Sequence, residues 1–195
     1  MTHCAVLVDG VVIGVRTALH DSSRLTVRLC DGKNPARIII DPQGRLPDDA
    51  PALRDDGTRR FVVQATERPR AKGVQVIRLE PRNGQLDPAE ISARLRGEGL
   101  HSLLIEGGGI TIARFLEAKL LTRLQVAIAP LLIGGGPQGL TMPSPSEYLS
   151  SALRPQMRAF SLGSDVVFDC GFTPAAAQAQ QPVHVTPSQR LPSYH

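Results

Sequence analysis

The sequence predicts an α/β fold built on a mostly parallel sheet. Short runs rich in β-branched residues recur along the chain, and several are continuously apolar, which is typical of strands buried on both faces of such a sheet. A segment with helical spacing and clear end signals lies between two of these runs. The chain has 195 residues, of which 42% are hydrophobic, enough for one well-buried domain. Alternating strands and helices then predict helices on both faces of the sheet.

The expected strands are the apolar runs themselves. In chain order they are 11–14, 37–41, 60–64, 74–79, 102–106, 124–130 and 165–169.

One expected helix lies between the fourth and fifth runs, in "DPAEISARLRGEG". Asp87 suits the N-cap, Pro88 the first helical position, and Glu90 follows the cap by three residues. Gly97 or Gly99 would end this helix.

The composition changes from Thr173 onward. "TPAAAQAQQPVHVTPSQRLPSYH" is rich in proline, alanine and glutamine, and its only charged side chain is Arg190. A segment without apolar periodicity cannot pack a core. We therefore expect one domain over residues 1–172 and a disordered tail over 173–195.

A glycine turn follows the fifth run, in "LLIEGGGITIARFL" at residues 103–116. Glu106 closes the run, three glycines follow, and helical spacing resumes near Thr111. Glycines let backbone N–H groups approach a phosphate, and a helix N-terminus favours negative charge. In open α/β sheets, ligands bind beyond the carboxyl ends of the strands. The turn is either a phosphate site or a tight turn without a ligand.

A second glycine triplet, 134–136, follows the run at 124–130. We expect both triplets to leave neighbouring strands and to line one sheet edge with backbone donors. That arrangement favours a cofactor that contains a pyrophosphate. Glu106, which is a pure acceptor when ionised, would either bind N–H groups of a polar heterocycle or accept bonds from nearby turn amides.

Composition excludes several classes of protein. The net charge is +4 and the pI is near 9.3, but the charges are mixed along the chain, and 4% aromatics without Trp argue against a nucleic-acid stacking surface. No run approaches the roughly 18 apolar residues of a membrane span, and "MTHCAVLVDG" lacks the features of a secretory signal, so we expect a cytoplasmic protein. The three cysteines are far apart, which indicates neither a metal site nor disulfides.

Three separated segments carry a resemblance to a known family. They are "LLIEGGGITIARFLEAKLLTRLQVAIAPLLIGGG", "VIGVRTALHDSSRLTVR" and "LGSDVVFDCGF", and "RIIID" fits as well. Over about residues 3–172 the chain resembles the reductase domain of the bifunctional riboflavin-biosynthesis deaminase/reductase. The resemblance implies a dihydrofolate-reductase-like three-layer αβα fold, a homodimer and NADPH as cofactor. It also implies reduction of the ribose in a phosphorylated small molecule, 5-amino-6-(5-phosphoribosylamino)uracil or a related pterin-like substrate.

The resemblance also implies roles for individual residues. Thr17 and Asp21 fall on cofactor positions, and Leu25 and Arg28 on substrate positions. The Arg28 guanidinium suits a substrate phosphate, although a surface arginine at a strand end is the alternative. Glu106 matches the substrate-binding acid of the family. The cofactor segment comprises Gly108, Gly109, Ile110, Thr111, Ile112, Ala113 and Arg114.

The chain departs from the family pattern in two places. Family members begin with a further strand and a loop reading "SLDG", and this chain starts after them, so an N-terminally truncated, non-catalytic nucleotide-binding or partner-binding domain is the alternative function. Pro42 stands where the family often has a cofactor-contacting Ser. Neither an H-x-E nor a PCxxC string occurs, which predicts no deamination. Arg45 and Arg68 are the candidates for the 2′-phosphate of NADPH.

Overall fold

The computed structural model describes residues 8–20, 34–106, 108–136, 139–140, 142 and 152–172. The chain divides into two compact units, one formed by Met1–Leu120 with Leu131–Ala152 and the other by Leu121–Pro130 with Leu153–His195. The expected tail lies outside the described residues. Within the described ranges, no helix is both long enough and apolar enough to cross a membrane.

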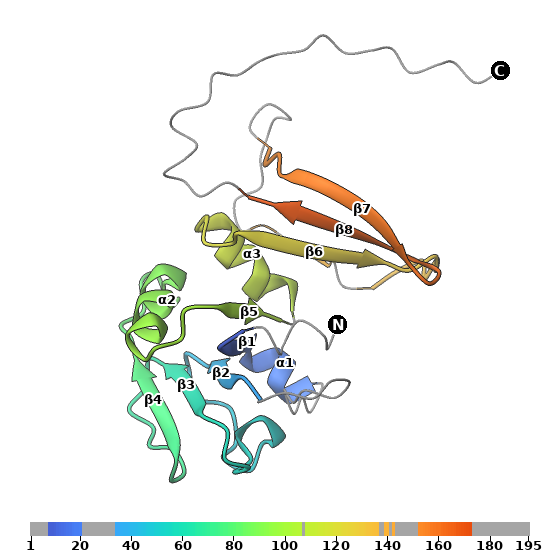
Figure 1. Ribbon diagram of the computed structural model, residues 1–195. Helices are drawn as coiled ribbons and strands as arrows, with labels where there is room; N and C mark the ends of the chain where they lie inside the picture. The colour runs from blue at the N-terminus through green and yellow to red at the C-terminus, as the bar shows by residue number, and fades with distance from the viewer. Residues whose placement is uncertain are drawn as a thin grey trace, which may run out of the picture. The chain divides into compact units, whose positions relative to one another are not determined.

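The larger unit contains a five-stranded parallel sheet (Figure 1). Its order is β4-β3-β2-β1-β5, so only β5 departs from chain order. The strands are β1 (Gly10–Gly14), β2 (Ala36–Ile40), β3 (Arg60–Gln64), β4 (Val74–Arg78) and β5 (Leu103–Ile105). The first three are almost fully buried, as the uninterrupted apolar run inside each of them predicts.

Helices follow β1, β4 and β5. They are α1 (Val15–His20), α2 (Pro88–Gly97) and α3 (Gly109–Glu117), with a 3₁₀ helix at Pro51–Leu53. The sequence predicts α2 correctly, because the Asp87 carboxylate accepts a 2.9 Å hydrogen bond from the Ala89 N–H at its N-terminus. Gly99, with a φ of 81°, takes the left-handed conformation that commonly follows a helix.

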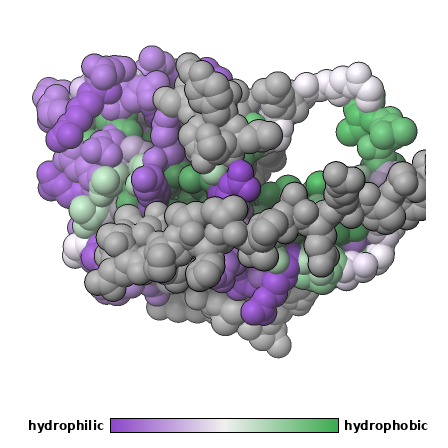
Figure 2. Space-filling model, turned by 90° about the horizontal axis from the view of Figure 1, so that it is seen from above, coloured by the Kyte–Doolittle hydropathy of each residue, from purple (hydrophilic) through white to green (hydrophobic). Residues whose placement is uncertain are grey.

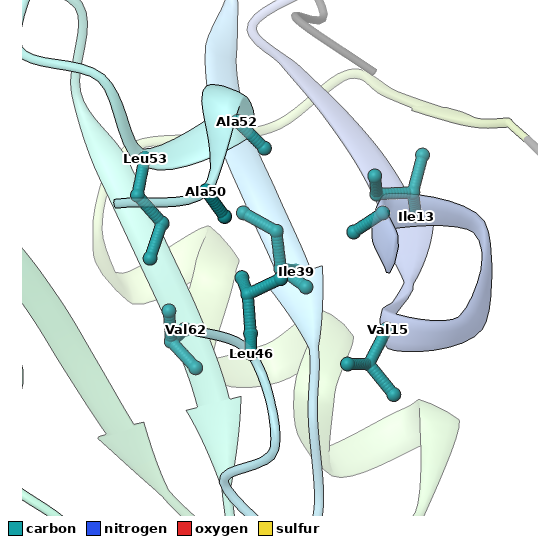
Figure 3. Close-up of a cluster of buried hydrophobic side chains, with 9 residues drawn as sticks. Ile13, Val15, Ile39, Leu46, Ala50, Ala52, Leu53 and Val62 are labelled. Atoms are coloured by element: carbon teal, nitrogen blue, oxygen red, sulfur yellow. The ribbon is translucent and has the colours of Figure 1, made fainter. Parts of the chain in front are cut away.

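The core lies on both faces of the parallel sheet. One face carries a cluster to which α1 and the loop after β2 contribute (Figure 3). Its members are Ile13, Val15, Ala18, Ile39, Leu46, Ala50, Ala52, Leu53 and Val62. Gly14 lies on the opposite face, because side chains alternate along a strand, and a Cβ added there would lie 2.6 Å from Thr111 Oγ1 of α3. Helices therefore cover both faces, as predicted.

The smaller unit is a three-stranded antiparallel sheet of order β6-β8-β7. Its strands are β6 (Arg123–Ile128), β7 (Gln156–Leu162) and β8 (Asp165–Gly171). β7 was not predicted, because "QMRAFSL" mixes polar and apolar residues and so does not form an apolar run.

The expectation that both glycine triplets leave neighbouring strands was wrong. The first triplet follows β5 of the parallel sheet, whereas the strand before the second is β6, which pairs with β8. In "RLQVAI", polar or small residues alternate with larger apolar ones, a pattern typical of an antiparallel strand with unlike faces. The alternation outweighs the overall apolar character of the run.

On the face in Figure 2, hydrophilic side chains make up most of the described surface at the left, and hydrophobic ones gather at the centre and right.

Candidate functional site

A pocket of about 560 Å³ opens in the larger unit, beyond the carboxyl ends of β1, β2 and β5. Gly14 and Ile40 are the last residues of β1 and β2, and Gly108 lies just after β5. Apolar side chains that include Leu86 and Phe115 supply part of the wall. This edge of a parallel sheet is where ligands of open α/β folds bind.

The glycine turn and α3 present backbone donors to this pocket. Gly108 is the N-cap of α3 and has no side chain to cap the first turn. Its own N–H donates a 3.0 Å hydrogen bond to Thr17 Oγ1, and its carbonyl accepts one from the Thr111 N–H at 3.0 Å. The first N–H groups of a helix have no intrahelical acceptor. Free N–H groups in the first turn of a helix, together with the helix dipole, are the donors that an anionic ligand requires.

Gly108 and Gly109 are glycines for different structural reasons. A Cβ at Gly109 would lie 2.2 Å from the Gly139 carbonyl oxygen, which no side chain tolerates. A Cβ at Gly108 would meet only Thr17 Oγ1, at 3.3 Å, and the φ of Gly108 is an ordinary −54°. Packing therefore requires a glycine at position 109, whereas at position 108 the fold could accommodate a Cβ after a small shift of Thr17.

Three arginines line the pocket, and none of its described lining residues is Asp or Glu. Arg16 lies on α1, Arg45 lies in the loop after β2, and Arg114 lies in the last turn of α3. Partial burial lowers the pKa of the Arg114 guanidinium, while the Glu117 carboxylate opposes that shift. An arginine remains protonated at neutral pH even so. The charge of the pocket favours an anionic ligand with several phosphate groups.

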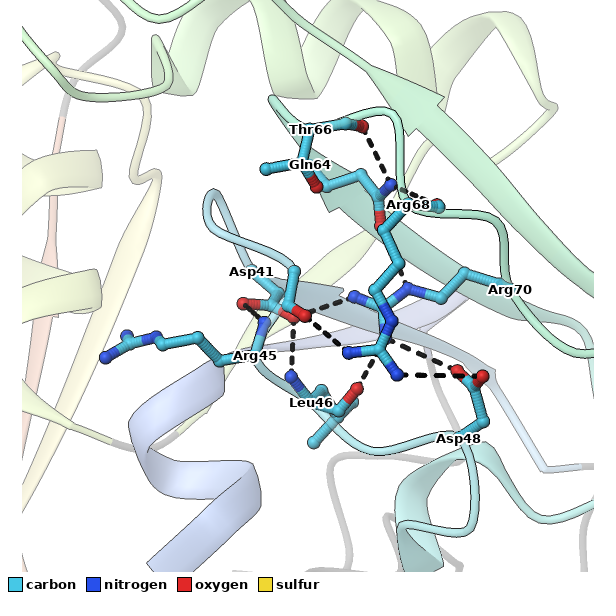
Figure 4. A network of polar contacts seen from close by, with 9 residues as sticks. Asp41, Arg45, Leu46, Asp48, Gln64, Thr66, Arg68 and Arg70 are labelled. Atoms are coloured by element: carbon cyan, nitrogen blue, oxygen red, sulfur yellow. Dashed lines mark hydrogen bonds and ion pairs between the residues drawn. The ribbon is translucent and has the colours of Figure 1, made fainter.

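A buried network holds the loop that carries Arg45 (Figure 4). The Asp41 carboxylate accepts hydrogen bonds from the backbone N–H groups of Arg45 at 2.9 Å and Leu46 at 2.8 Å. It also forms a 2.8 Å ion pair with Arg70, and both side chains are fully buried. The start of this loop is thus fixed from inside the protein.

Comparison with known proteins identifies the family. The model of the RibD C-terminal domain matches residues 4–168. The chain belongs to the RibD C-terminal domain family. It is 28% identical, over 83% of its length and 78% of the relative, to the 2,5-diamino-6-ribosylamino-4(3H)-pyrimidinone 5′-phosphate reductase of Methanothermobacter thermautotrophicus. It is 29% identical to the riboflavin biosynthesis protein RibD of Actinobacillus pleuropneumoniae, over 83% of this chain and 45% of that protein.

Solved structures share the fold of this RibD C-terminal domain. The Thermotoga maritima diaminohydroxyphosphoribosylaminopyrimidine deaminase/5-amino-6-(5-phosphoribosylamino)uracil reductase matches with a TM-score of 0.76 at 20% identity, over 87% of this chain and 47% of that one. The riboflavin biosynthesis reductase of Saccharomyces cerevisiae matches with a TM-score of 0.72 at 20% identity, over 88% and 79%. The chain spans about half the length of the bifunctional relatives. The dihydrofolate-reductase-like α/β fold is confirmed.

The structure brings most of the described candidate cofactor residues of this RibD domain into the one pocket. Those lining it are Thr17, Gly108, Gly109, Ile110, Thr111 and Arg114. Ala113 is buried in the core, and the half-buried Ile112 is absent from the described lining. Asp21, Leu25 and Arg28 lie outside the described residues.

Glu106 lies one residue beyond β5 and is half-buried. Its backbone N–H donates to the Val12 carbonyl at 2.9 Å, which continues the ladder between β5 and β1. Among the described residues, no turn amide donates to its carboxylate, and the Gly108 N–H is directed to Thr17 instead. The described turn therefore gives this carboxylate no capping role.

Arg16 lines the pocket but was not predicted to do so, and two groups that were predicted near the cofactor are absent from the described lining. Arg16 directly precedes Thr17 on α1, and this position next to a predicted cofactor residue is the sequence signal that could have identified it. Arg45 lines the pocket, but Arg68 donates to the Gly44 carbonyl and pairs with Asp48 at 3.7 Å. The glycines at 134–136 are absent from the described pocket lining. Their strand, β6, belongs to the other sheet.

Proposed function

We propose that the chain is an NADPH-dependent reductase of riboflavin biosynthesis, which reduces the ribose of a phosphorylated ribosylaminopyrimidine. The observation that carries the proposal is the pocket with three arginines and the N-terminus of α3, without a described carboxylate in its lining. A dinucleotide phosphate needs these cationic and backbone donors. The reductase names of the relatives support the reaction type.

The pocket residues fit NADPH in chemical character. The amides at the start of α3 would bind the pyrophosphate, and Arg45 would bind the 2′-phosphate, since a guanidinium matches phosphate geometry. Bound NADPH supplies the hydride that reduces the ribose carbon. The residues of the chain would hold the nucleotide, and the apolar part of the pocket wall, which includes Leu86 and Phe115, would exclude water from the site.

The substrate side of the proposal depends on Glu106, together with Leu25 and Arg28 by the family pattern. Glu106 follows β5, next to the glycine turn, and its carboxylate has no partner among the described residues. It is thus available to bind the N–H groups of the heterocycle. Arg28 would bind the substrate phosphate, and Asp21 would join Thr17 on the cofactor side.

This function can be tested by measuring nucleotide binding and turnover on the same protein preparation. Fluorescence titration should show tighter binding of NADPH than of NADH, because only NADPH carries the 2′-phosphate. NADPH oxidation should then require the phosphorylated ribosylaminopyrimidine. Equal affinity for the two nucleotides would refute the cofactor assignment. Tight NADPH binding without turnover would favour the alternative function, a non-catalytic nucleotide-binding or partner-binding domain.

The proposal includes a homodimer. Sheet edges and apolar sheet faces favour association when they are uncovered, and in the smaller unit Val126, Ile128 and Val166 are each more than a third exposed. Sedimentation at micromolar concentration should show a dimer or a larger species. A clean monomer would contradict it.

A further inference from the structure

The Arg70 side chain connects the end of β3 to the loop that carries Arg45 (Figure 4). We infer that Arg70 is a positioning residue for the nucleotide, which acts through Asp41 by holding Arg45 at the pocket. The inference rests on the proposed function, because it concerns the affinity of the same pocket. Arg70 itself is absent from the described lining.

The guanidinium of Arg70 is held in several directions at once. Its Nε donates to Gln64 Oε1 at 2.9 Å, Nη2 donates to Asp41 at 2.8 Å, and Nη1 donates to the Leu46 carbonyl. Gln64 is fully buried, and its own amide donates to the carbonyls of Thr66 at 2.9 Å and Arg68 at 2.6 Å. The acceptor of Nε is therefore fixed as well. A planar fork so held cannot rotate without losing bonds.

Asp41 links the fixed guanidinium of Arg70 to the backbone of the loop that carries Arg45. One carboxylate oxygen accepts the Arg45 N–H, and the other accepts both the Leu46 N–H and Arg70 Nη2. The Arg70 guanidinium compensates the charge of the fully buried Asp41 carboxylate, so Asp41 accepts these two amides as part of a paired and hydrogen-bonded group. The exposed Arg45 side chain begins from this fixed backbone.

Lysine cannot replace Arg70 in this arrangement. An ammonium group keeps the positive charge near Asp41 but cannot reproduce a planar fork directed at Gln64, Asp41 and the Leu46 carbonyl together. Arg70→Lys should loosen the loop while it preserves charge compensation. The pocket would then lose the fixed position of Arg45 without a change in net charge.

Arg37 provides a matched control. It is 1% exposed, lies near the start of β2, donates to the Arg54 carbonyl at 3.2 Å and pairs with Asp56. Arg37 thus fixes the loop of Arg54 and Asp56 near the start of β2, whereas Arg70 fixes the loop that follows the end of β2. Neither Arg54 nor Asp56 is in the described lining of the pocket. Arg37→Lys should therefore cost stability alone.

The test compares Arg70→Lys, Arg37→Lys, Arg45→Gln and the Arg70→Lys/Arg45→Gln double variant in the full chain. NADPH and NADH affinities are titrated well below each melting temperature. Arg70→Lys should weaken NADPH binding about tenfold, as expected for one charge-assisted phosphate contact, and NADH binding much less. In the Arg45→Gln background, Arg70→Lys should cause no further loss. Arg37→Lys should lower the melting temperature and leave both affinities unchanged.

Several outcomes would overturn the inference and leave the proposed function intact. These are NADPH affinity unchanged in a folded Arg70→Lys, an equal loss for NADPH and NADH, or additive effects in the double variant. If Arg70→Lys does not fold, Gln64→Met replaces it, since it removes the Nε acceptor but keeps the ion pair with Asp41. A selective loss of NADPH affinity supports the inference, and an unchanged affinity overturns it. Failure of the unmodified chain to bind NADPH would refute the proposed function, and the inference with it.

Discussion

The backbone N–H of Gly108 donates a 3.0 Å hydrogen bond to the hydroxyl of Thr17. This bond joins the glycine turn after β5 to the helix after β1, two segments 91 positions apart in the chain. Both residues line the pocket. The position of the turn therefore depends on a side chain from a different element.

Thr17→Val tests this dependence. Valine keeps the shape of threonine but removes the acceptor, so the Gly108 N–H loses its fixed direction. We expect NADPH affinity to fall by about 1 kcal/mol, the usual net value of one such bond. Melting should change little, because the bond is exposed to solvent. Thr17→Ser, which keeps the hydroxyl, is the control, and wild-type affinity in the valine variant would contradict the prediction.

Gly108→Val should cripple NADPH binding in a folded protein. The added Cβ meets only Thr17 Oγ1, at 3.3 Å, but the branched side chain blocks the approach of a phosphate to the backbone. Gly109→Ala is the comparison, because its Cβ would lie 2.2 Å from the Gly139 carbonyl oxygen and should lower the melting temperature. Titration and thermal melting of both variants separate the two effects. A folded Gly108→Val with normal affinity would make the turn purely structural.

Glu106→Gln should separate substrate binding from cofactor binding. The substitution replaces an acceptor oxygen with a donor, which would face the N–H groups of the heterocycle. Substrate affinity should fall by roughly 2–4 kcal/mol, from a lost charge-assisted bond and a mismatched donor. NADPH affinity should persist, because Gly108 and Gly109 are unchanged. A loss of stability alone, with turnover intact, would show that Glu106 is not a substrate ligand.

Acid sensitivity should depend in part on Asp9. The backbone N–H groups of Ser102 and His101, each 2.8 Å from its carboxylate, hold the pKa of Asp9 below its usual value. A lowered pKa in the folded state stabilises the protein above the unfolded pKa of about 3.9, and that contribution is lost as pH falls through the folded value.

Asp9→Asn should therefore lower the denaturation midpoint at neutral pH, and the difference from wild type should shrink below about pH 4. Urea midpoints from pH 3 to 7 measure this. Glu80→Gln, at an exposed carboxylate that makes no hydrogen bond to the described residues, should show no such dependence. A constant difference for Asp9→Asn at every pH would refute the prediction.

Much of the fold was predictable because its signals are local. The buried strands β1, β2 and β3 each contain an uninterrupted run of three apolar residues, and α2 begins directly after the residue that caps it. Strand neighbours are not local. The residues of β6 do not indicate that this strand pairs with β8. The mixed composition of β7 does not predict a strand, and the segment is a strand because it pairs with β8.

The candidate site also combines residues with local sequence signals and residues that only the fold brings together. The glycine turn, Thr17 and Arg45 all line the pocket. The first two could be singled out because they stand in recognisable motifs, and Arg45 because it follows a strand. The buried pair of Asp41 and Arg70 was not found, since 29 residues separate its members and only the fold brings them together. The sequence therefore identifies groups that line the pocket better than the buried groups that hold them in place.

The position of β5 in the sheet has a consequence for the order of folding. Strands β1 to β4 are neighbours in chain order, so this ladder can begin to form once Arg78 has been synthesised. β5 must return to β1, where Asp9 bonds to residues 92 and 93 positions further along, and closing such a long loop is slow. The pocket, which needs both Thr17 and Gly108, is complete only after this step. A nucleotide that binds the completed pocket should therefore stabilise the state in which β5 is paired with β1.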